Sequence, residues 1–479
     1  MNLAVIGSGY VGLVAGACLA ELGHIVTLVD NDTTKINALT GGDVPIHERF
    51  LPELIARNTS AGRLSFSGSI ADAVQNSSVI FIAVGTPPMD SGAPDLSYVE
   101  AVAAAVAAHV GDYKIVVEKS TVPVLTHQQI HKVMMLNGAP LDSVDIVSNP
   151  EFLREGTAVS DFLYPDRIVV GSDSQRAAAA LREVYEPLTS GSYYRRTDAL
   201  PGPLGFPGSA RLLITSAKGA ELIKHASNSF LAMKISFINA VANICEVVGA
   251  DIDEVGQGIG TDSRIGVRFL RPGVGYGGSC FGKDLLAFRQ VAHECGLELG
   301  LLDEVIKVNE EQKCRFVRKV RTALWTLRGK RIAALGLAFK GGTDDIRESP
   351  AIAIIQALQQ EGAQIAVHDP AAMDRAKAIL GSSVVYASSA YEACRGAHAL
   401  LVLTDWQEFA ELDLVEIRSA LRHPIVIDGR NIFRCEDMRA AGFHYYSVGR
   451  PTVDIGKGQH KPGGALDASV PFKAYAKRQ

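Results

Sequence analysis

Short apolar runs alternate with helical stretches over residues 1–185, and this alternation is the first regularity along the chain. Residues 3–7 and 25–30 are apolar and β-branched, and the stretch between them has helical periodicity. Similar runs lie at 79–84, 114–118, 144–148 and 168–171, with an alanine-rich helical stretch at 99–110. Strands that alternate with helices in this way predict a doubly wound parallel sheet.

The middle of the chain changes character twice. Six prolines and glycines between residues 201 and 208 predict an irregular linker within 190–215. Residues 216–249 then contain no proline and carry apolar side chains at helical spacing. They predict one helix, about 50 Å long at the usual rise per residue. Such a helix usually spans two domains or packs against a partner chain, and a second helical stretch is expected at 300–327.

A second α/β pattern begins after Lys330, with strands expected at 331–335, 364–367, 399–403 and 424–427. The fold class is therefore α/β, with two Rossmann-like doubly wound sheets joined by a central helical domain with one long helix. The expected parts are a nucleotide-binding domain over 1–195, an irregular insertion over 196–215, a central helical domain over 216–327, a second Rossmann-like domain over 328–449 and a tail over 450–479.

Composition excludes several classes of protein. The chain has 479 residues, more than one core can hold, and 47% hydrophobic with 21% charged residues is ordinary for a globular protein. A net charge of −5 gives no basic footprint for nucleic acid, and no run of lysine or arginine suggests a membrane surface. No apolar stretch approaches the length of a membrane span. The chain begins with a strand and no signal peptide is recognised. Seven scattered cysteines suggest neither a disulfide framework nor a metal site, so we expect a cytoplasmic enzyme without a metal.

The motif Gly7-Ser-Gly9-Tyr10-Val11-Gly12 follows the first predicted strand and opens a helix. The first glycine permits a tight turn, the second lets a pyrophosphate reach the helix N-terminus, and the third allows close helix–strand packing. Asp30 ends the next strand, where it would bind the adenosine ribose and repel a 2′-phosphate. The motif therefore predicts NAD rather than NADP. Lys35 is either a further cofactor contact or a solvated helix lysine.

Polar residues follow several later strands. Gly85-Thr86 and the segment Lys119 to Pro123 stand beyond strand ends, where open α/β sheets bind ligands, although either could be an ordinary turn. Lys224 and Asn228 stand four residues apart, on one face of the long helix. A buried lysine facing an anionic intermediate and a surface lysine–carboxylate pair are both compatible with that spacing.

Residues 273–284, Gly-Val-Gly-Tyr-Gly-Gly-Ser-Cys-Phe-Gly-Lys-Asp, are the most distinctive stretch of the sequence. Glycines let a bulky ligand approach the backbone, and the apolar residues after Asp284 predict a helix start. Cys280 would then lie just ahead of a positive helix terminus, which lowers the pKa of a thiol and favours the nucleophilic thiolate. A small buried cysteine in a loop is the alternative interpretation.

Taken together, these motifs resemble the UDP-glucose/GDP-mannose dehydrogenase family. The matching stretches are Gly7–Gly12, 119–123, 149–156, 224–228, 263–266, the Cys280 segment, 336–350 and 428–431. The residues around Cys280 resemble the form that acts on UDP-glucose. Three features depart from the family pattern: residues 195–215 are longer than expected, Ala240 stands where glutamate is common, and the C-terminal tail matches nothing.

The resemblance implies oxidation of a sugar C6 hydroxyl to a carboxylate by two hydride transfers to two NAD molecules, with one water consumed. For UDP-glucose the product is UDP-glucuronate. Cys280 would add to the intermediate aldehyde as a thiohemiacetal, which is oxidised to a thioester and hydrolysed. Lys224 and Asn228 would stabilise the oxyanion. Asp284, Thr121 and Glu155 would position water and relay protons.

The resemblance also implies two sets of binding residues. Those expected at NAD are Gly7, Gly9, Tyr10, Val11, Gly12, Asp30, Lys35, Gly85, Thr86, Thr121, Glu155, Lys283 and Arg347. Those expected at the UDP-sugar are Glu151, Phe152, Leu153, Arg154, Glu155, Lys224, Asn228, Arg264, Phe269, Gly273, Gly275, Tyr276, Gly277, Phe339, Lys340 and Arg430. Lys340 and Arg430 suit a diphosphate. Arg264 resembles a residue that reaches a neighbouring subunit's active site.

Three alternatives stay open at this point. Within the family, the substrate could be GDP-mannose or another UDP-sugar. A single-step NAD dehydrogenase of the hydroxyacyl-CoA or 6-phosphogluconate type would leave Cys280 structural. A non-catalytic NAD-binding scaffold is the third. The long helix further predicts a homodimer or higher homo-oligomer.

Overall fold

A computed structural model describes residues 1–89 and 92–455. The chain divides into two compact units, each considered by itself below. The first unit comprises Met1–Leu231, Gly277–Asp303 and Gly341–Arg347. The second comprises Ala232–Tyr276, Glu304–Lys340 and the chain from Glu348 onward. The two α/β halves and the long central helix confirm the expected fold class, whereas the boundaries of the three expected domains stay a prediction.

The first unit is built on an eight-stranded sheet in the order β3-β2-β1-β4-β5-β6-β7-β8. All neighbours are parallel except β6 and β7, which pair antiparallel. The strands are β1 (Asn2–Ile6), β2 (Ile25–Val29), β3 (Leu64–Ser67), β4 (Val79–Ile82), β5 (Lys114–Glu118), β6 (Val144–Ser148), β7 (Ile168–Gly171) and β8 (Leu212–Thr215). The order 3-2-1-4-5-6 of the first six strands is that of dinucleotide-binding sheets.

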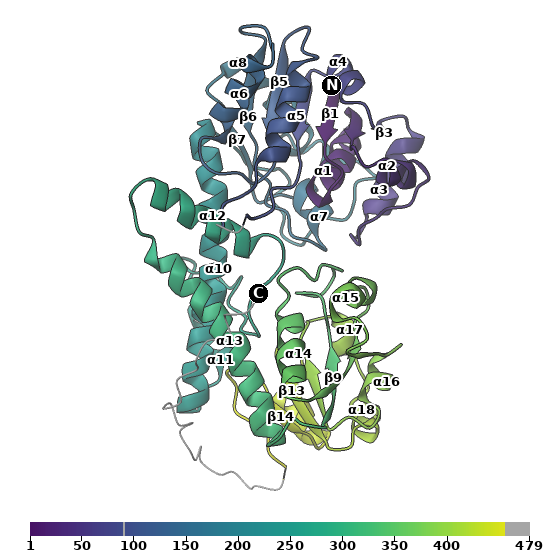
Figure 1. Ribbon diagram of the computed structural model, residues 1–479, viewed down its shortest axis with the longest axis vertical. Helices are drawn as coiled ribbons and strands as arrows, with labels where there is room; N and C mark the ends of the chain where they lie inside the picture. The colour runs from purple at the N-terminus through teal and green to yellow at the C-terminus, as the bar shows by residue number, and fades with distance from the viewer. Residues whose placement is uncertain (90–91, 456–479) are drawn as a thin grey trace. The chain divides into compact units, whose positions relative to one another are not determined.

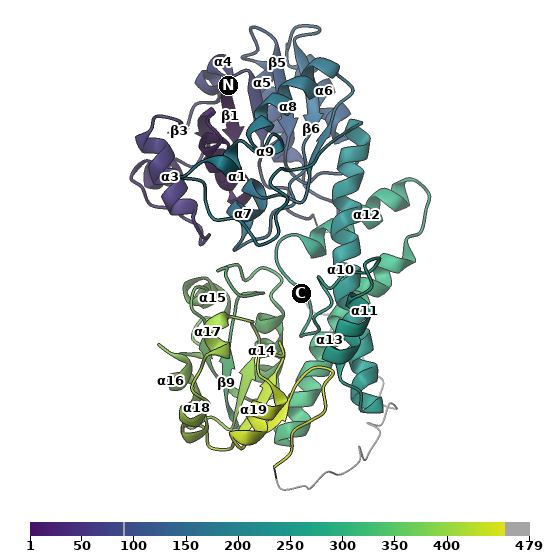
Figure 2. The ribbon, with the colours of Figure 1, turned by 180° about the vertical axis from the view of Figure 1, so that it is seen from behind.

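Helices cover both faces of this sheet (Figures 1 and 2), because side chains alternate along each strand. In β1, Leu3 and Val5 join one apolar core, and Ala4 and Ile6 join another. The helices are α1 (Tyr10–Glu21), α2 (Thr33–Thr40), α3 (Leu51–Ser60), α4 (Ile70–Asn76), α5 (Ser97–Ala107), α6 (Thr126–Leu136), α7 (Ala158–Leu163), α8 (Gln175–Val184) and α9 (Glu186–Thr189). A 3-10 turn spans Tyr193–Arg195.

The segment expected to be an irregular linker is anchored to the first unit, and its end is a strand. Leu212–Thr215 forms β8 at the edge of the sheet, in parallel register with β7. The four residues are apolar or β-branched, a composition that favours strands. Upstream, Tyr164, Tyr194 and Phe206 form an aromatic cluster, with 4.7 Å between the ring centroids of the last two.

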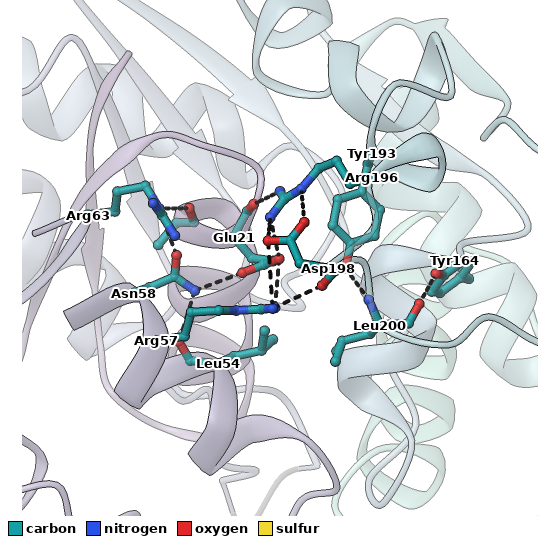
Figure 3. Close-up of polar contacts among 11 residues, drawn as sticks. Glu21, Leu54, Arg57, Asn58, Arg63, Tyr164, Tyr193, Arg196, Asp198 and Leu200 are labelled. Carbon is teal, nitrogen blue, oxygen red and sulfur yellow. Dashed lines mark hydrogen bonds and ion pairs between the residues drawn. The ribbon is translucent and has the colours of Figure 1, made fainter. Parts of the chain in front are cut away.

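A buried carboxylate at the end of α1 ties this segment down (Figure 3). Glu21 is inaccessible to solvent, and its Oε1 lies 2.7 Å from Arg57 and 3.1 Å from Arg196. Its Oε2 accepts a hydrogen bond from Asn58 at 3.0 Å. Arg196 also pairs with Asp198 at 2.7 Å. Since a buried charge without partners is very costly, this set of contacts holds residues 195–198 in place.

The second unit contains a six-stranded, fully parallel sheet in the order β11-β10-β9-β12-β13-β14. Its strands are β9 (Arg331–Leu335), β10 (Gln364–His368), β11 (Val385–Tyr386), β12 (Ala399–Val402), β13 (Ile425–Asp428) and β14 (His444–Tyr446). Its helices are α14 (Pro350–Gln360), α15 (Met373–Leu380), α16 (Ala390–Cys394), α17 (Gln407–Ala410), α18 (Leu414–Ala420) and α19 (Cys435–Ala440). The two short edge strands β11 and β14 were not expected from the sequence.

The central helices are α10 (Ala217–Val248), α11 (Ile252–Gly260), α12 (Phe281–Glu294) and α13 (Gly300–Leu324). The long helix α10 (Figure 1) begins after Ser216, whose hydroxyl accepts the Gly219 amide. It stops before Gly249, whose φ of +80° is one that glycine adopts readily. Its first half belongs to the first unit and its second half to the second unit.

The expectation that no segment could span a membrane needs one correction. By length and composition, α10 could cross a bilayer: its most apolar 18-residue window has a mean hydropathy of 1.5, and 33% of that window is buried. Polar side chains interrupt this window, so it contains no unbroken apolar run of that length. Three of the polar residues on α10, Glu221, Lys224 and Asn228, are buried in the first unit. They assign that part of the helix to the protein interior.

Candidate active site

The turn after β1 has the geometry of a dinucleotide cradle. Gly7 has a φ of +107°, and a Cβ there would lie 2.6 Å from the Ala83 carbonyl oxygen. A Cβ on Gly12 would lie 1.8 Å from the Gly7 oxygen, so neither position accepts a side chain. A Cβ on Gly9 would meet no atom within 4 Å, and Gly9 caps α1 without a side-chain partner. The absent side chain leaves space for a pyrophosphate at a helix N-terminus.

Asp30 stands at the end of β2, beside this turn. Its Oδ2 accepts the Ser8 amide at 2.7 Å and the Ser8 hydroxyl at 2.6 Å, and its Oδ1 accepts the Asp32 amide at 2.9 Å. Burial raises the pKa of Asp30, but these hydrogen bonds outweigh it and the net shift is downward. The group is therefore an ionised, partly exposed carboxylate with unused lone pairs. Lys35 lies 3.9 Å from Asp32 and is well exposed.

The loops after β4 and β5 meet, as expected from their places at strand ends. The Thr86 hydroxyl donates to the Thr121 carbonyl at 2.9 Å. Both threonines line a small pocket that Lys283 and Asp284 also line. The same pocket reaches His225, whose Nε2 bonds the Val122 carbonyl at 2.7 Å.

Lys224 is buried and paired. Its Nζ donates to the Glu151 carbonyl at 2.7 Å and to Glu151 Oε1 at 2.8 Å. Burial lowers the pKa of Lys224, but Glu151, Asp284 and Cys280 raise it, and the net shift is upward. The side chain is therefore a fixed cation in a region of low dielectric, where its field acts strongly. The interpretation of Lys224 as a surface lysine is wrong.

Cys280 lies at the N-cap of α12, and Asp284 lies in the first turn of that helix. The Asn228 side chain donates to Asp284 Oδ2 at 2.6 Å, and Lys283 donates to Oδ1 at 2.8 Å. Burial raises the pKa of Asp284, but Lys283 and Lys224 outweigh it and the net shift is downward. Helix α10 and helix α12 therefore place a lysine, an amide and a carboxylate around one thiol.

The expected low pKa of this thiol is not what the structure gives. Burial and the charge of Glu151 raise the pKa of Cys280 to about 11, although Lys224 and Lys283 act in the opposite direction. The position ahead of a helix was predicted correctly, but desolvation and two nearby carboxylates outweigh the helix terminus. With a pKa of about 11, Cys280 is a protonated thiol at neutral pH.

A second polar group adjoins Cys280 on the other side. The Ser279 hydroxyl lies 3.6 Å from Cys280 Sγ and donates to Glu155 Oε1 at 2.9 Å. Arg347 donates to the same Glu155 oxygen at 3.1 Å and pairs with Asp345 at 2.7 Å. Burial and the adjacent Asp345 raise the pKa of Glu155 to about 8.

The segment 341–347 supplies two of these residues and belongs to the first unit. Gly156 has a φ of +83°, and a Cβ on it would lie 2.4 Å from the Gly342 carbonyl oxygen. The Gly278 amide donates to the Arg347 carbonyl at 2.9 Å. Two glycines thus permit the close approach that brings Asp345 and Arg347 to Glu155.

Several predicted substrate residues form a connected group in the second unit. Arg430 donates to the carbonyls of Leu403 at 2.8 Å, Phe339 at 2.6 Å and Gly275 at 3.3 Å. Gly273 and Tyr276 donate their amides to Asn239 and Asn309, both at 2.8 Å. Arg430 thereby fixes the backbone beside Phe339 and Gly275, and two of its five N–H groups stay outside these bonds.

Three regions of the chain match domains of one family of known proteins. Residues 1–189 match the NAD binding domain of the UDP-glucose/GDP-mannose dehydrogenase family, residues 218–311 its central domain and residues 333–435 its UDP binding domain. The chain belongs to this family. The match confirms the resemblance seen in the motifs and the expectation that NAD is the cofactor.

Individual relatives agree over nearly the whole length. UDP-glucose 6-dehydrogenase TuaD of Bacillus subtilis (strain 168) is 45% identical, with 94% of both chains covered. UDP-glucose 6-dehydrogenase of Rhizobium meliloti (strain 1021) is 44% identical, with 94% of this chain and 100% of the relative covered. A solved UDP-glucose dehydrogenase from Pyrobaculum islandicum has a TM-score of 0.84 and 38% identity, covering 94% of this chain and 98% of its own.

The structure brings eight of the expected first-unit residues into one network. Glu151, Glu155, Lys224, Asn228, Cys280, Lys283, Asp284 and Arg347 are linked by the contacts above. Tyr10 also joins it, because its hydroxyl donates to Glu48 and accepts the Gly156 amide at 2.7 Å. Phe152 packs against the Arg167 guanidinium, 3.6 Å from its ring centre.

Some predicted site residues form ion pairs with residues outside the expected site. Arg154 pairs with Asp161 at 2.5 Å, which does not belong to the expected site. Arg264, in the second unit, is highly exposed and pairs with Asp262 at 2.6 Å. The Lys35 geometry favours the interpretation as a helix lysine. The roles of Phe269, Gly277, Lys340 and the remaining predicted contacts stay predictions.

The sequence reasoning gave no role to five residues that the structure places in or beside the network. They are Lys119, Glu221, His225, Ser279 and Asp345. Lys119 is buried, donates to Asn149, and has its pKa lowered to about 8 by burial. Glu221 accepts the amides of Leu125 and His127 at 2.7 and 2.9 Å and so fixes the loop that carries Thr121. All five lie in the quoted motifs or within three residues of one, but the motifs do not show which side chains these residues contact.

Proposed function

We propose that this family member is an NAD-dependent UDP-glucose 6-dehydrogenase, which converts UDP-glucose to UDP-glucuronate with reduction of two NAD molecules. The relatives named UDP-glucose 6-dehydrogenase support the choice of substrate. The observation that carries the proposal is the thiol of Cys280 beside the buried Lys224–Glu151 pair. Oxidation of an alcohol to an aldehyde needs no nucleophile, whereas oxidation of an aldehyde to an acid does.

Lys224 stabilises the negative charge that develops on the substrate oxygen. Its ammonium is fixed by Glu151 before the reaction, so stabilising a developing alkoxide requires little reorganisation. Asn228 is held by Asp284, and its remaining amide N–H is available to the same oxygen. Bound NAD supplies the hydride acceptor for both oxidations, and the glycine turn with Asp30 fits its pyrophosphate and ribose.

Cys280 carries the second oxidation. Addition of its sulfur to the aldehyde carbon gives a thiohemiacetal, whose carbon bears a hydrogen that can leave as hydride. Loss of that hydride leaves a thioester on Cys280, and water cleaves it to the acid. Asp284, a carboxylate with a lowered pKa, and Thr121 line one pocket and are suited to orient that water.

The test counts NADH against limiting UDP-glucose and identifies the product by mass. The wild-type enzyme should release two NADH per UDP-glucose and end at UDP-glucuronate. Cys280→Ala should bind UDP-glucose about as well yet lose essentially all formation of the acid, with at most a small NADH burst. Cys295→Ala, at an exposed cysteine, is the matched control and should behave as wild type.

One NADH per sugar in the wild type would contradict the proposal and favour a single-step dehydrogenase. The same assay with GDP-mannose, UDP-galactose and UDP-N-acetylhexosamines tests the substrate. If any of these sugars is turned over faster than UDP-glucose, that sugar would be the substrate and the proposed activity would change to another one in the family. No turnover with any of them would favour a scaffold.

We further propose that α10 joins two copies of the chain. Phe230, Phe237 and Ile244 stand seven residues apart on this helix and are 57%, 55% and 61% exposed. Beside Ile244, the side chains of Val247, Val248 and Val308 line a groove. A regular apolar stripe of this kind is expected to be covered in solution. If the α10 helices of two copies packed against each other about a twofold axis, each helix would cover the apolar stripe of the other.

Light scattering tests the assembly, and an active monomer at assay concentration would contradict it. The predicted trans role of Arg264 has its own test. Equal mixing of Arg264→Ala and Cys280→Ala subunits should restore roughly a quarter of wild-type activity, because one site of each hybrid dimer keeps both groups. No recovery in a mixture shown to contain hybrids would remove that role.

A further inference from the structure

The position of Cys280 raises the question of where its proton goes. Its pKa of about 11 means that the sulfur enters the reaction as a thiol. The carboxylates with the largest effect on it, Glu151 and Asp284, are both engaged. Glu151 accepts from Lys224 and from the Leu153 amide, and Asp284 accepts from Asn228 and Lys283. Both Glu151 oxygens are thus occupied by donors, and the lysines around Asp284 lower its pKa, so that it is a poor proton acceptor.

Ser279 offers a different route. Its hydroxyl oxygen lies 3.6 Å from Cys280 Sγ, within hydrogen-bond range for sulfur, and the hydroxyl proton points to Glu155 Oε1 at 2.9 Å. Because that proton is donated to Glu155, the serine oxygen is free to accept from the thiol. Thiol, hydroxyl and carboxylate therefore form a directed chain within the first unit.

We propose that Ser279 relays the proton of the Cys280 thiol to Glu155 when the sulfur adds to the aldehyde. The proposal rests on the proposed function, of which it specifies one step. The S–H bond breaks and a C–S bond forms, with both S–H electrons staying on sulfur. The serine oxygen takes the thiol proton and passes its own to Glu155. The aldehyde oxygen, which gains the carbonyl electron pair, lies where Lys224 and Asn228 can stabilise it. Nothing is oxidised or reduced in this step.

The same chain serves the last step in reverse. Hydrolysis of the thioester expels Cys280 as a thiolate, which needs a proton to return to its resting form. Glu155, protonated since the addition, gives its proton to Ser279, and Ser279 gives its own to the sulfur. One proton is stored and returned in each turnover, because the group that accepts a proton as a base can give it back as an acid.

The surroundings of Glu155 suit it to this exchange. Burial and Asp345 raise its pKa to about 8, and Arg347 and Ser279 act in the opposite direction. Tyr10 also interacts electrostatically with Glu155. A carboxyl group with a pKa near the working pH can both accept and release a proton, whereas an ordinary glutamate would hold too little of the acid form. Asp345 is thus a positioning residue that acts through Glu155.

The first test is Ser279→Ala. Formation of the acid should fall about 100-fold or more, the usual range for loss of a positioned proton-transfer group. The first oxidation should continue, so hydroxylamine should trap the aldehyde that the wild type consumes. Ser279→Thr keeps a hydroxyl and should retain most of the wild-type rate. Thermal unfolding verifies that each variant folds, with Ser236→Ala as the control for loss of a buried serine hydroxyl.

The pH profile separates a relay from a structural role. In the wild type, the rate of acid formation should rise with pH and level off near pH 8, as Glu155 ionises. In Ser279→Ala that plateau should disappear, and the rate should keep rising about tenfold per pH unit to pH 9 as the thiol itself ionises. Asp345→Asn should move the wild-type plateau to lower pH, because it removes the charge that raises the pKa of Glu155. This variant keeps the proposal testable if Ser279→Ala fails to fold.

The outcomes distinguish the relay from the proposed function. A wild-type enzyme that makes no UDP-glucuronate would overturn the proposed function and the relay with it. A wild type that makes the acid with two NADH, together with a Ser279→Ala variant of similar rate and pH profile, would overturn the relay alone. An unchanged plateau in Asp345→Asn would likewise remove Glu155 as the proton acceptor.

Discussion

The first turns of the two sheets share one plan but differ in what their aspartate does. In each, a glycine with positive φ follows the first strand: Gly7 at +107° and Gly336 at +97°. In each, the aspartate at or just after the end of the second strand accepts amides from that turn. Asp30 is partly exposed and accepts from Ser8 and Asp32. Asp369 is only 1% exposed.

The Asp369 carboxylate accepts hydrogen bonds from five donors. Its Oδ2 accepts the amides of Leu337 and Ala338 and the indole N–H of Trp406, and its Oδ1 accepts the amides of Ala371 and Ala372. The chain then runs through residues 337–349 before α14 begins, whereas α1 begins directly after Gly9. The same turn can therefore present a carboxylate to a ribose or lock it inside as a structural anchor. The difference between the two aspartates goes with whether a helix begins directly after the turn.

The strongest test of this contrast is Asp369→Ala. The change leaves four backbone amides and an indole N–H without an acceptor in a buried site, which should cost about 3–5 kcal/mol of unfolding free energy. Asp30→Ala should cost about 1–2 kcal/mol, because Asp30 is partly exposed and fewer donors lose their acceptor. Urea unfolding of both variants measures the difference. Equal losses would mean that the two aspartates are not distinguished by burial.

A smaller effect is expected from the glycines of the first turn. Gly12→Ala should destabilise by about 2–3 kcal/mol, because its Cβ would lie 1.8 Å from the Gly7 oxygen. Gly9→Ala should leave the urea midpoint unchanged but weaken NAD binding about tenfold, since its Cβ enters the space expected for the pyrophosphate. NAD titration by calorimetry measures the second effect. Normal NAD affinity in Gly9→Ala would place the pyrophosphate elsewhere.

Asp30→Ala should also change the choice of cofactor. An anion beside its carboxylate is repelled by about 1–3 kcal/mol at the dielectric of a protein surface, so the wild type should strongly prefer NAD over NADP. The variant should narrow that preference without abolishing turnover, as measured by kcat/KM for both cofactors. Equal kcat/KM in the wild type would contradict the role given to Asp30. Asp369→Asn is the matched control and should leave the preference unchanged.

The contrast also shows where sequence reasoning ends. The positions of Gly7, Asp30, Lys224 and Cys280 could be predicted, because local sequence patterns indicate glycine turns, strand ends and helix faces. The edge strand β8 was missed because four residues after a proline-rich stretch carry little signal. Asp345 approaches Glu155 across 190 residues of chain, a distance in sequence that no local pattern bridges. The pKa of Cys280 depends on the sum of burial and surrounding charges, which only the assembled site supplies.

The smallest effect belongs to Trp406→Phe, which removes one donor from Asp369 and keeps an aromatic ring in place. The indole N–H bond, 3.2 Å long, is one of five to that carboxylate, so its loss should cost about 0.5–1.5 kcal/mol. A double-mutant cycle with Asp369→Asn isolates the contact, because the tryptophan substitution should cost less once the acceptor is uncharged. Urea unfolding of the four proteins gives the coupling energy. Zero coupling would mean that Trp406 only packs beside Asp369, and the closure of that turn would then rest on its backbone amides alone.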